Sequence, residues 1–399
     1  MTFCDVPQIR ISDPGDLIET VPYLIGFHPV ESLVLIGFTD PEGAGRPQRV
    51  QVTMRVDLPQ SPVDAEVFEP LVESLRHADA TSAAVVVFTH CTGDPRDSGE
   101  LQALAAAVST VLRAAAIMVL DVLVASDEHW WSLCCDKPSC CPPEGTRRAL
   151  GCSPSAAQAT FAGLVALPDR AAVSATLAGL SPDERAAVEP DLAEAEHRVA
   201  RAALAHGLGR LRKSDTAAFR TAAERARQRA WTDEPAPDEP APDEPAPDEP
   251  APDRSAAEGM APGASSAVAP SAATPGRRRT TVRPLSHKQL ARFGVALSDL
   301  GVRDAMWLAI DDQSLDATEL LHELHIRLPA PYDAAPLFLY GWAQWRAGNG
   351  TLAVMAAERA LESDPNYSAA LLLVTAVQRG MDPRSTPALR DPDLLGAQQ

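Results

Sequence analysis

The sequence contains few cysteines, few aromatic residues and no long apolar run. Of its 399 residues, 7 are cysteine and 5% are aromatic. No apolar run reaches the roughly 18 residues that a membrane-spanning helix needs. The N-terminus also lacks the basic start and apolar stretch of a secretory signal. We therefore expect a soluble, cytoplasmic protein with no membrane partner, in which disulfides are rare.

Nucleotide-binding and common catalytic motifs are absent as well. Neither G-x-G-x-x-G nor G-x-x-x-x-G-K-[ST] follows a predicted strand, and H-E-x-x-H and G-x-S-x-G do not occur.

The formal net charge is −19. That charge argues against a general nucleic-acid binder, because an acidic surface is repelled by phosphates.

Proline, in contrast, is abundant and is concentrated in one segment. Four D-E-P-A-P repeats occupy residues 233–252. Repeated prolines remove backbone donors and block helices, and the acidic side chains repel one another. We therefore predict a disordered acidic linker over 232–280, which divides the chain into two folded parts.

The part before the linker alternates between strand and helix patterns. Apolar or alternating runs predict strands at 32–38, 49–59, 83–90 and 118–126, and helical spacing predicts helices at 63–78 and 99–116. Turn residues between the first two strands indicate a hairpin, and the strand–helix–strand order that follows indicates parallel strands. We predict an α/β domain over 1–152, with a mostly parallel sheet and an antiparallel hairpin at one edge.

The remaining segments predicted to fold are helical. Residues 153–231 form a predicted helical extension, and residues 281–399 form a predicted all-α domain with helices at 286–299, 302–311, 316–327, 334–347, 350–363 and 367–379. Gly341 on one helix, with Ala353 and Ala360 on the next, would let the two helices approach closely. This pair resembles one tetratricopeptide unit. The alternative is an ordinary helix pair inside a small bundle.

Several stretches, taken in order, resemble one protein family. They are PYLIGFHPVESLVLIGF at 22–38, MRVDLP at 54–59, CCPPEG at 140–145, GVRDAMWLAI at 301–310 and GWAQWRAGNGTLAVMAAERALESDPNYSAALLL at 341–373. Together they are similar to the actinobacterial domain-of-unknown-function family 4192. The resemblance implies an intracellular actinobacterial protein and carries over no catalytic residues.

Polar residues follow the predicted strands at one rim of the sheet. In open α/β sheets, ligands bind beyond the carboxyl ends of the strands. The candidate catalytic residues at this rim are Arg55, Asp57, His90, Asp127 and His129. The same composition also fits an ordinary polar rim, because loops are polar by default. His28 precedes a strand, and we expect it at the opposite rim.

Four of the seven cysteines, from Cys134 to Cys141, form the second candidate site. Cys135 and Cys140 enclose four residues, a spacing that structural zinc sites use. The candidate metal ligands are Cys135, Cys140, Cys141 and Cys152, with Cys91 or His129 as further donors, and the metal would be zinc. A reactive thiol and inert packing thiols remain alternatives, because adjacent cysteines are expected to point apart and no second C-x-x-C pair exists.

These observations favour a binding or regulatory protein that contacts another protein through its C-terminal helices. The alternative is an enzyme, such as a hydrolase, with its site at the strand-end rim. His322 and His325 are three residues apart on a predicted helix. We expect them on an ordinary exposed helix face rather than at a metal.

Overall fold

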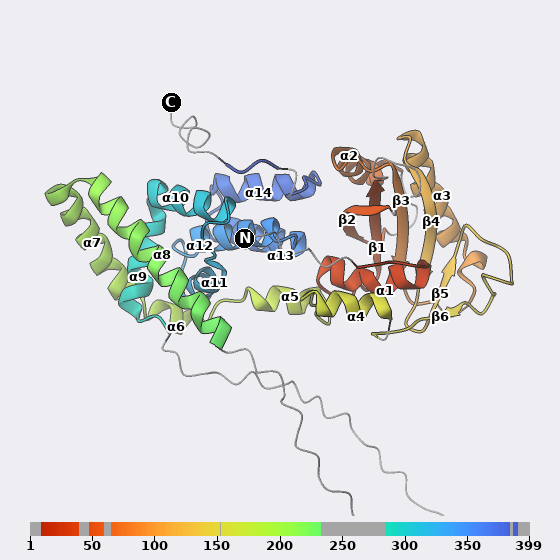
Figure 1. The fold of residues 1–399 in the computed structure, drawn as a ribbon, viewed down its shortest axis with the longest axis horizontal. Coiled ribbons are helices and arrows are strands. Elements are labelled where there is room, and N and C mark those ends of the chain that lie inside the picture. The colour runs from red at the N-terminus through yellow and green to blue at the C-terminus, as the bar shows by residue number, and fades with distance from the viewer. Residues whose placement is uncertain are drawn as a thin grey trace, which may run out of the picture.

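The computed structural model describes residues 9–39, 48–59, 65–91, 93–151, 153–232, 284–383 and 386–389. The predicted linker, apart from residue 232, lies outside the described residues, and so does Cys152. Figure 1 shows an elongated arrangement, with an α/β part at one end and a helical part at the other. None of the described helices is both long and apolar enough to cross a membrane.

A six-stranded sheet forms the α/β part, with the strand order β2-β1-β3-β4-β5-β6. The strands are β1 (Ser32–Thr39), β2 (Arg49–Asp57), β3 (Ser82–Phe88), β4 (Met118–Ala125), β5 (His129–Ser132) and β6 (Thr146–Arg147). β1 pairs antiparallel with both β2 and β3, and β3 pairs parallel with β4. β2, β3 and β4 therefore run in one direction, which confirms the predicted strand directions and the edge hairpin.

The sheet is nevertheless mixed rather than mostly parallel. β1 lies between β2 and β3, so the connection from β2 to β3 passes over β1. β5 and β6, which the sequence does not predict, add two antiparallel pairings at the other edge. Both are too short to show a periodic pattern, and only the pairing of β5 with β4 and of β6 with β5 defines them.

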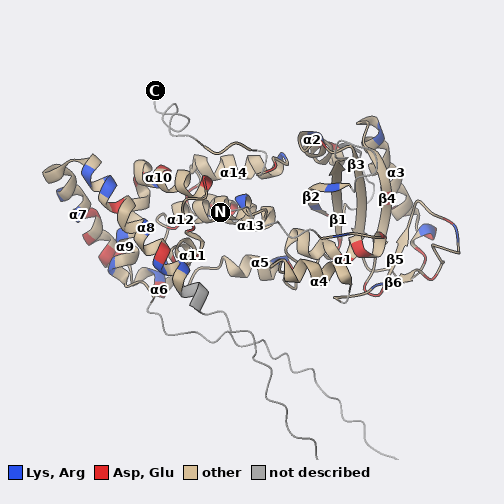
Figure 2. Cartoon of the chain, viewed as in Figure 1, with Lys and Arg blue, Asp and Glu red and all other residues tan. Residues whose placement is uncertain are grey.

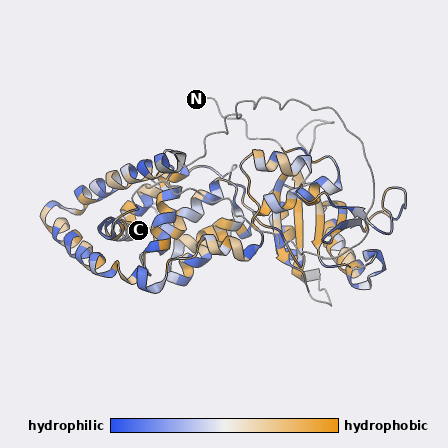
Figure 3. Ribbon diagram, turned by 90° about the horizontal axis from the view of Figure 1, so that it is seen from below, coloured by the Kyte–Doolittle hydropathy of each residue, from blue (hydrophilic) through white to orange (hydrophobic). Residues whose placement is uncertain are grey.

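Helices cover both faces of the sheet. Helix α1 (Pro14–Ile25) packs on one face, and α2 (Glu69–His77) and α3 (Gly99–Ala114) pack on the other. The side chains of β1 and β3 are almost all buried, as expected for strands covered on both faces. Figure 3 shows this apolar centre of the sheet. Short 3-10 turns precede the two helices of the second face, η1 (Ala65–Phe68) before α2 and η2 (Pro95–Asp97) before α3.

The remaining helices of the described chain follow the sheet, and all but α4, which packs against α1, belong to the helical part. They are α4 (Pro154–Phe161), α5 (Arg170–Thr176), α6 (Pro182–Ala186), α7 (Glu189–His206), α8 (Leu208–Thr232), α9 (His287–Ser298), α10 (Leu300–Asp311), α11 (Thr318–Arg327), α12 (Ala334–Arg346), α13 (Gly350–Ser363) and α14 (Ser368–Gln378). Every predicted C-terminal helix is present within two residues of its expected bounds. The predicted fold class, an α/β part followed by helices, is therefore confirmed.

Helices from both sides of residues 233–283 share one core. Helices α7 and α8 pack against α9, and α8 also contacts α10 and α11. The rings of Phe219 and Phe293 meet edge to face at 5.6 Å, and Arg292 forms a 2.9 Å ion pair with Asp215. Figure 2 shows charged residues along α7, α8 and α9 and few on the central strands. The helical extension thus packs with the C-terminal helices.

The end of α14 also contacts the α/β part. The Ser74 hydroxyl on α2 donates a 2.7 Å hydrogen bond to the backbone carbonyl of Gln378. Gly380 packs so closely here that a Cβ atom would lie 2.9 Å from the Ser74 carbonyl oxygen. The two parts are therefore joined at α2 as well as along α4 and α5, as Figure 1 shows.

Candidate functional site

The strand-end rim includes the beginning of β1. Ser32 lies opposite Asp57 in β2 and opposite Phe88 in β3, because β1 is antiparallel to both. The segment that leads into β1 from His28 therefore reaches this rim, and the expectation of the opposite rim is wrong. The backbone N–H of His28 donates to the Leu167 carbonyl at 2.9 Å.

Arg55 and Asp57 form an ion pair at this rim. Arg55 Nη1 lies 2.6 Å from Asp57 Oδ1, and Arg55 Nε donates to Ser32 Oγ at 2.9 Å. The Asp57 side chain is largely exposed, whereas that of Arg55 is mostly covered. These contacts join the start of β1 to the end of β2. Of the two charged side chains, that of Asp57 is the one exposed to a ligand.

His90 and Asp127 approach each other across the ends of β3 and β4. His90 Nδ1 is 3.7 Å from Asp127 Oδ2, too long for a hydrogen bond, and the side chains are 74% and 90% exposed. Glu31 adopts a left-handed φ of 42°, and its carboxylate accepts hydrogen bonds from Thr89 Oγ1 at 2.9 Å and the His90 N–H at 3.1 Å. Glu31, which the sequence does not single out, thus holds the His90 backbone in place.

His129 lies in a strand rather than in a rim loop. It pairs with Arg147 across β5 and β6. Its ring lies 6.1 Å from the ring of Trp131. The rim therefore brings together Arg55 with Asp57 and His90 with Asp127, while His129 belongs to the neighbouring edge hairpin.

The cysteine loop connects β5 to β6 and gathers three sulfurs. Cys135 Sγ lies 3.3 Å from Cys140 Sγ, and the sulfurs of Cys135, Cys140 and Cys141 all lie within 4.8 Å of one another. We call these three residues the thiol trio. Cys140 and Cys141 both contribute to it, so the expectation that adjacent cysteines point apart is wrong here.

The other proposed donors do not join the thiol trio. Cys134 lies outside it, Cys91 donates from its sulfur to the Gly93 carbonyl at 3.2 Å, and His129 is in β5. Cys152 lies outside the described residues. The four loop cysteines are exposed or half-buried. This exposure argues against inert packing thiols inside a core.

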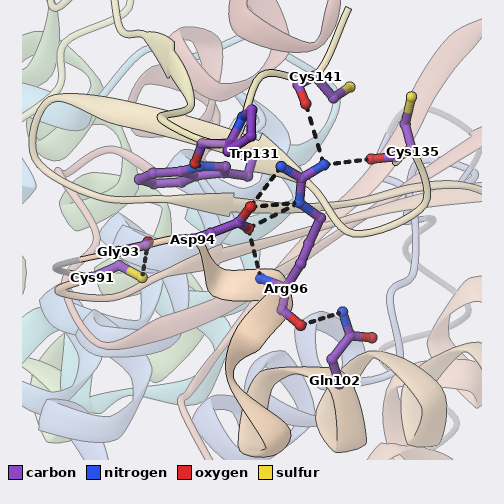
Figure 4. A network of polar contacts seen from close by, with 9 residues as sticks. Cys91, Gly93, Asp94, Arg96, Gln102, Trp131, Cys135 and Cys141 are labelled. Atoms are coloured by element: carbon purple, nitrogen blue, oxygen red, sulfur yellow. Dashed lines mark hydrogen bonds and ion pairs between the residues drawn. The ribbon is translucent and has the colours of Figure 1, made fainter. Parts of the chain in front are cut away.

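Arg96 holds the two halves of the loop together. Its Nη1 donates to the carbonyl oxygens of Cys135 and Cys141, each at 3.2 Å. The Asp94 carboxylate accepts hydrogen bonds from Arg96 Nε at 2.9 Å and from Arg96 Nη2 at 2.7 Å. These contacts lower the pKa of the Asp94 carboxyl. In Figure 4 the sulfurs of Cys135 and Cys141 lie beyond these carbonyls, away from the guanidinium.

A tight turn adds to this support. The carbonyl oxygen of Lys137 accepts hydrogen bonds from the backbone N–H of Cys140 at 3.1 Å and that of Cys141 at 2.8 Å. The Cys140 sulfur also donates to this carbonyl at 3.6 Å. The turn therefore places the Cys140–Cys141 pair beside Cys135.

The end of the loop is fixed against Trp131. The indole N–H of Trp131 donates to the Pro143 carbonyl at 3.0 Å. Gly145 has a φ of 81°, and a Cβ atom there would lie 2.5 Å from the Trp131 ring. Only glycine fits this position, because a side chain would meet both the strained backbone and the ring.

The trio cysteines have different proton affinities. The backbone N–H of Lys137, with the thiols of Cys140 and Cys141, lowers the pKa of the Cys135 thiol. Burial and the neighbouring thiols raise the pKa of Cys141 to about 12. Cys134 is exposed as a residue, yet desolvation of its sulfur raises its pKa. The loop thus favours one thiolate at Cys135, the form that binds metals and attacks electrophiles.

Arg96 is the functional residue that sequence reasoning misses. Its carbonyl partners are 39 and 45 residues further along the chain, at a distance that no local pattern encodes. Asp94 does carry a signal, because Asp before Pro is a typical cap, and its carboxylate accepts the Arg96 N–H at 2.9 Å.

The chain was compared with known proteins and families. No curated protein and no solved structure matches it. The family described as a domain of unknown function, DUF4192, matches residues 14–384. The matched range runs from α1 to beyond α14 and so includes the sheet, the thiol trio and the C-terminal helices. The chain belongs to the DUF4192 family.

Proposed function

We propose that this protein is a binding or regulatory protein that contacts another protein through its C-terminal helices. The observation that carries the proposal is the outer surface of α14. Leu371 and Leu372 are each 57% exposed there, next to each other on the last described helix. Large adjacent apolar side chains in water favour a partner surface, because covering them is worth about 25 cal/mol per Å².

The way α12, α13 and α14 stack supports this proposal. α13 packs against both α12 and α14. Gly341 on α12 lies so close to α13 that a Cβ atom would be 3.0 Å from the Ala353 carbonyl oxygen. We interpret these helices as a tetratricopeptide-like unit. Terminal units of such stacks normally present a polar outer face, so the two exposed leucines among the polar residues of the α14 surface favour a bound partner.

A photo-crosslinking experiment tests the proposal. A photoreactive amino acid replaces Leu372 in the full-length protein, expressed in cells. The matched control carries it at Leu204, an exposed leucine on α7. We expect a discrete crosslinked product from position 372 that is lost when Leu371 is changed to Asp. Equal products from both positions, or none from 372, would contradict the proposal.

We further propose that the protein is cytoplasmic and of actinobacterial origin. The sequence resemblance supports the origin. The low cysteine content and the family resemblance, which implies an intracellular protein, support the compartment. Fractionation of the source cells, with detection of the native protein, tests the compartment, and finding the gene in an actinobacterial genome tests the origin.

A second candidate function is hydrolysis at the strand-end rim. It is favoured by the approach of His90 and Asp127, since a carboxylate beside an imidazole can orient a general base. The test is a panel of ester and phosphoester substrates, with His90→Ala as the variant. Hydrolysis that disappears with His90→Ala would support an enzyme. No turnover by the wild type, or turnover that His90→Ala leaves unchanged, would contradict it.

A further inference from the structure

The thiol trio has the spacing of a metal site. Zinc–sulfur bonds of about 2.3 Å in a tetrahedral arrangement place the sulfurs roughly 3.8 Å apart. In the structure, one sulfur pair lies at 3.3 Å and all three sulfurs lie within 4.8 Å. Small side-chain rotations therefore suffice to bring three sulfurs around one ion.

We propose that Cys135, Cys140 and Cys141 bind one zinc ion as thiolates. Each cysteine loses its thiol proton to solvent and gives a sulfur lone pair to the metal. Three sulfurs leave the fourth tetrahedral position to a donor outside the thiol trio. This inference stands independently of the partner-binding proposal, because it concerns the loop between β5 and β6 and not α14.

The backbone of the loop holds the trio in place. Arg96 ties the carbonyls of Cys135 and Cys141, and Asp94 fixes the guanidinium on its other side. Figure 4 shows that this network leaves the two sulfurs free on the far side. Groups that orient the ligands in this way are a regular part of metal sites. Three sulfurs are thus gathered where there is no apolar core for them to fill.

The donor set selects a thiophilic ion. The trio offers sulfur and no carboxylate, whereas calcium and magnesium require oxygen ligands. Thiolates prefer zinc, copper(I) or iron–sulfur centres. An iron–sulfur cluster is normally held by four cysteines, and the trio supplies three. Zinc fits a site of three thiolates with one further position.

Cobalt(II) titration of the full-length protein under reducing conditions tests the site. Cobalt(II) is a spectroscopic substitute for zinc. We expect one Co²⁺ per chain, a thiolate-to-cobalt absorption band in the near ultraviolet, and loss of that band when Zn²⁺ is added. Serine at Cys135, Cys140 or Cys141 should abolish this stoichiometric binding. Cys134→Ser, in the same loop but outside the thiol trio, is the matched control and should bind normally.

Arg96→Ala extends the test beyond the ligands. It removes the link between the two loop halves but no sulfur, so we expect the metal affinity to fall about 10–100-fold. Arg96→Lys should recover little, because one ammonium cannot donate to both carbonyls and bind Asp94 at two points.

Alkylation of the wild-type protein decides the matter if the variants fold poorly. Zn²⁺ should slow the reaction of Cys135, Cys140 and Cys141 with iodoacetamide and leave the rate at Cys134 unchanged, as read by mass spectrometry. The proposal is overturned if the wild type takes up less than one Co²⁺ per chain without a thiolate band. It is overturned equally if Cys134→Ser loses as much metal as the trio variants, or if Zn²⁺ protects none of the three.

Discussion

At the scale of single residues, His325 is the least expected feature of the helical part. It is 2% exposed, and neither ring nitrogen has a hydrogen-bond partner in the described part of the chain. The prediction of an exposed helix face is wrong for it, because α12 covers this side of α11 and the Tyr340 ring lies 5.3 Å from the His325 ring. Burial, reinforced by the nearby His322, Arg359 and Arg185, lowers the pKa of His325 to about 3.

This burial predicts a pH dependence of stability. The unfolded chain binds a proton at His325 near its ordinary pKa of about 6.5, and the folded chain does so only near 3. The free energy of unfolding should therefore fall as the pH drops from about 6.5 towards 3, by roughly 2 kcal/mol at pH 5. His325→Leu should remove this component in urea titrations at pH 7 and pH 5, whereas His206→Leu, at an exposed site, should keep it. Equal pH dependence in the two variants would contradict the assignment.

A buried ion pair gives a second residue-level prediction. Arg148 and Glu19 are 8% and 5% exposed, and Arg148 Nε lies 2.8 Å from Glu19 Oε1. Glu19→Ala leaves the arginine charge buried, so it should destabilise the fold by about 3–5 kcal/mol in urea unfolding. The double variant Glu19→Leu/Arg148→Met should regain most of this loss. If Glu19→Ala lowers the free energy of unfolding by less than about 1 kcal/mol, as loss of an exposed ion pair does, the prediction is wrong.

At the scale of elements, periodicity predicts most of the fold. The sequence predicts the bounds of β3, from its continuous apolar run, and of β2, from its alternating run, within two residues of those observed. Helix α1 is missed because Pro22 lies inside it and interrupts a helical pattern. β5 is missed because four residues show no period, and its pairing of Trp131 with Val124 depends on the sheet beside it.

The candidate site is predictable to the same extent. Clustering along the chain indicates the cysteine loop, but not which three sulfurs meet. Which three sulfurs meet depends on the turn at Lys137 and on the hydrogen bonds of Arg96. The hydrogen bond from Arg96 to the Cys135 carbonyl joins residues far apart in sequence. Strand direction alone predicts the rim positions of Arg55, Asp57, His90 and Asp127. It does not predict Glu31, because the role of Glu31 follows from a left-handed backbone conformation.

The packing of α12 against α13 predicts a steric effect at Gly341. An added Cβ atom would lie 3.0 Å from the Ala353 carbonyl oxygen and 3.2 Å from Ala356 Cβ. Gly341→Val should therefore destabilise the protein by about 1–3 kcal/mol, as overpacking does. Gly350→Ala is the matched control, because its Cβ atom would lie 3.7 Å from Val377 Cγ1 and should cost less than about 1 kcal/mol. Thermal unfolding of both variants measures the difference.

At the scale of the whole molecule, the sequence and the packing divide the chain differently. The sequence places a boundary at the acidic repeats. In the structure, however, α8 before the repeats and α9 after them lie in one helical body. Arg212 on α8 binds Asp299 at 2.8 Å, and Tyr332 hydrogen-bonds to Glu196 on α7 at 2.5 Å. The helical body is therefore built from both sides of residues 233–283.

Cleavage of the chain tests which division holds. With a protease site inserted within 233–283, we expect the two fragments to stay together in size-exclusion chromatography, because their contact buries Phe219 against Phe293. Phe219→Ala should weaken that association by about 3–5 kcal/mol, so the cut variant should separate at a lower urea concentration. Thr221→Ala, at an exposed position on the same helix, should behave as the wild type. If the cut wild-type fragments separate without urea, the two halves fold independently and the boundary predicted from the acidic repeats is the real one.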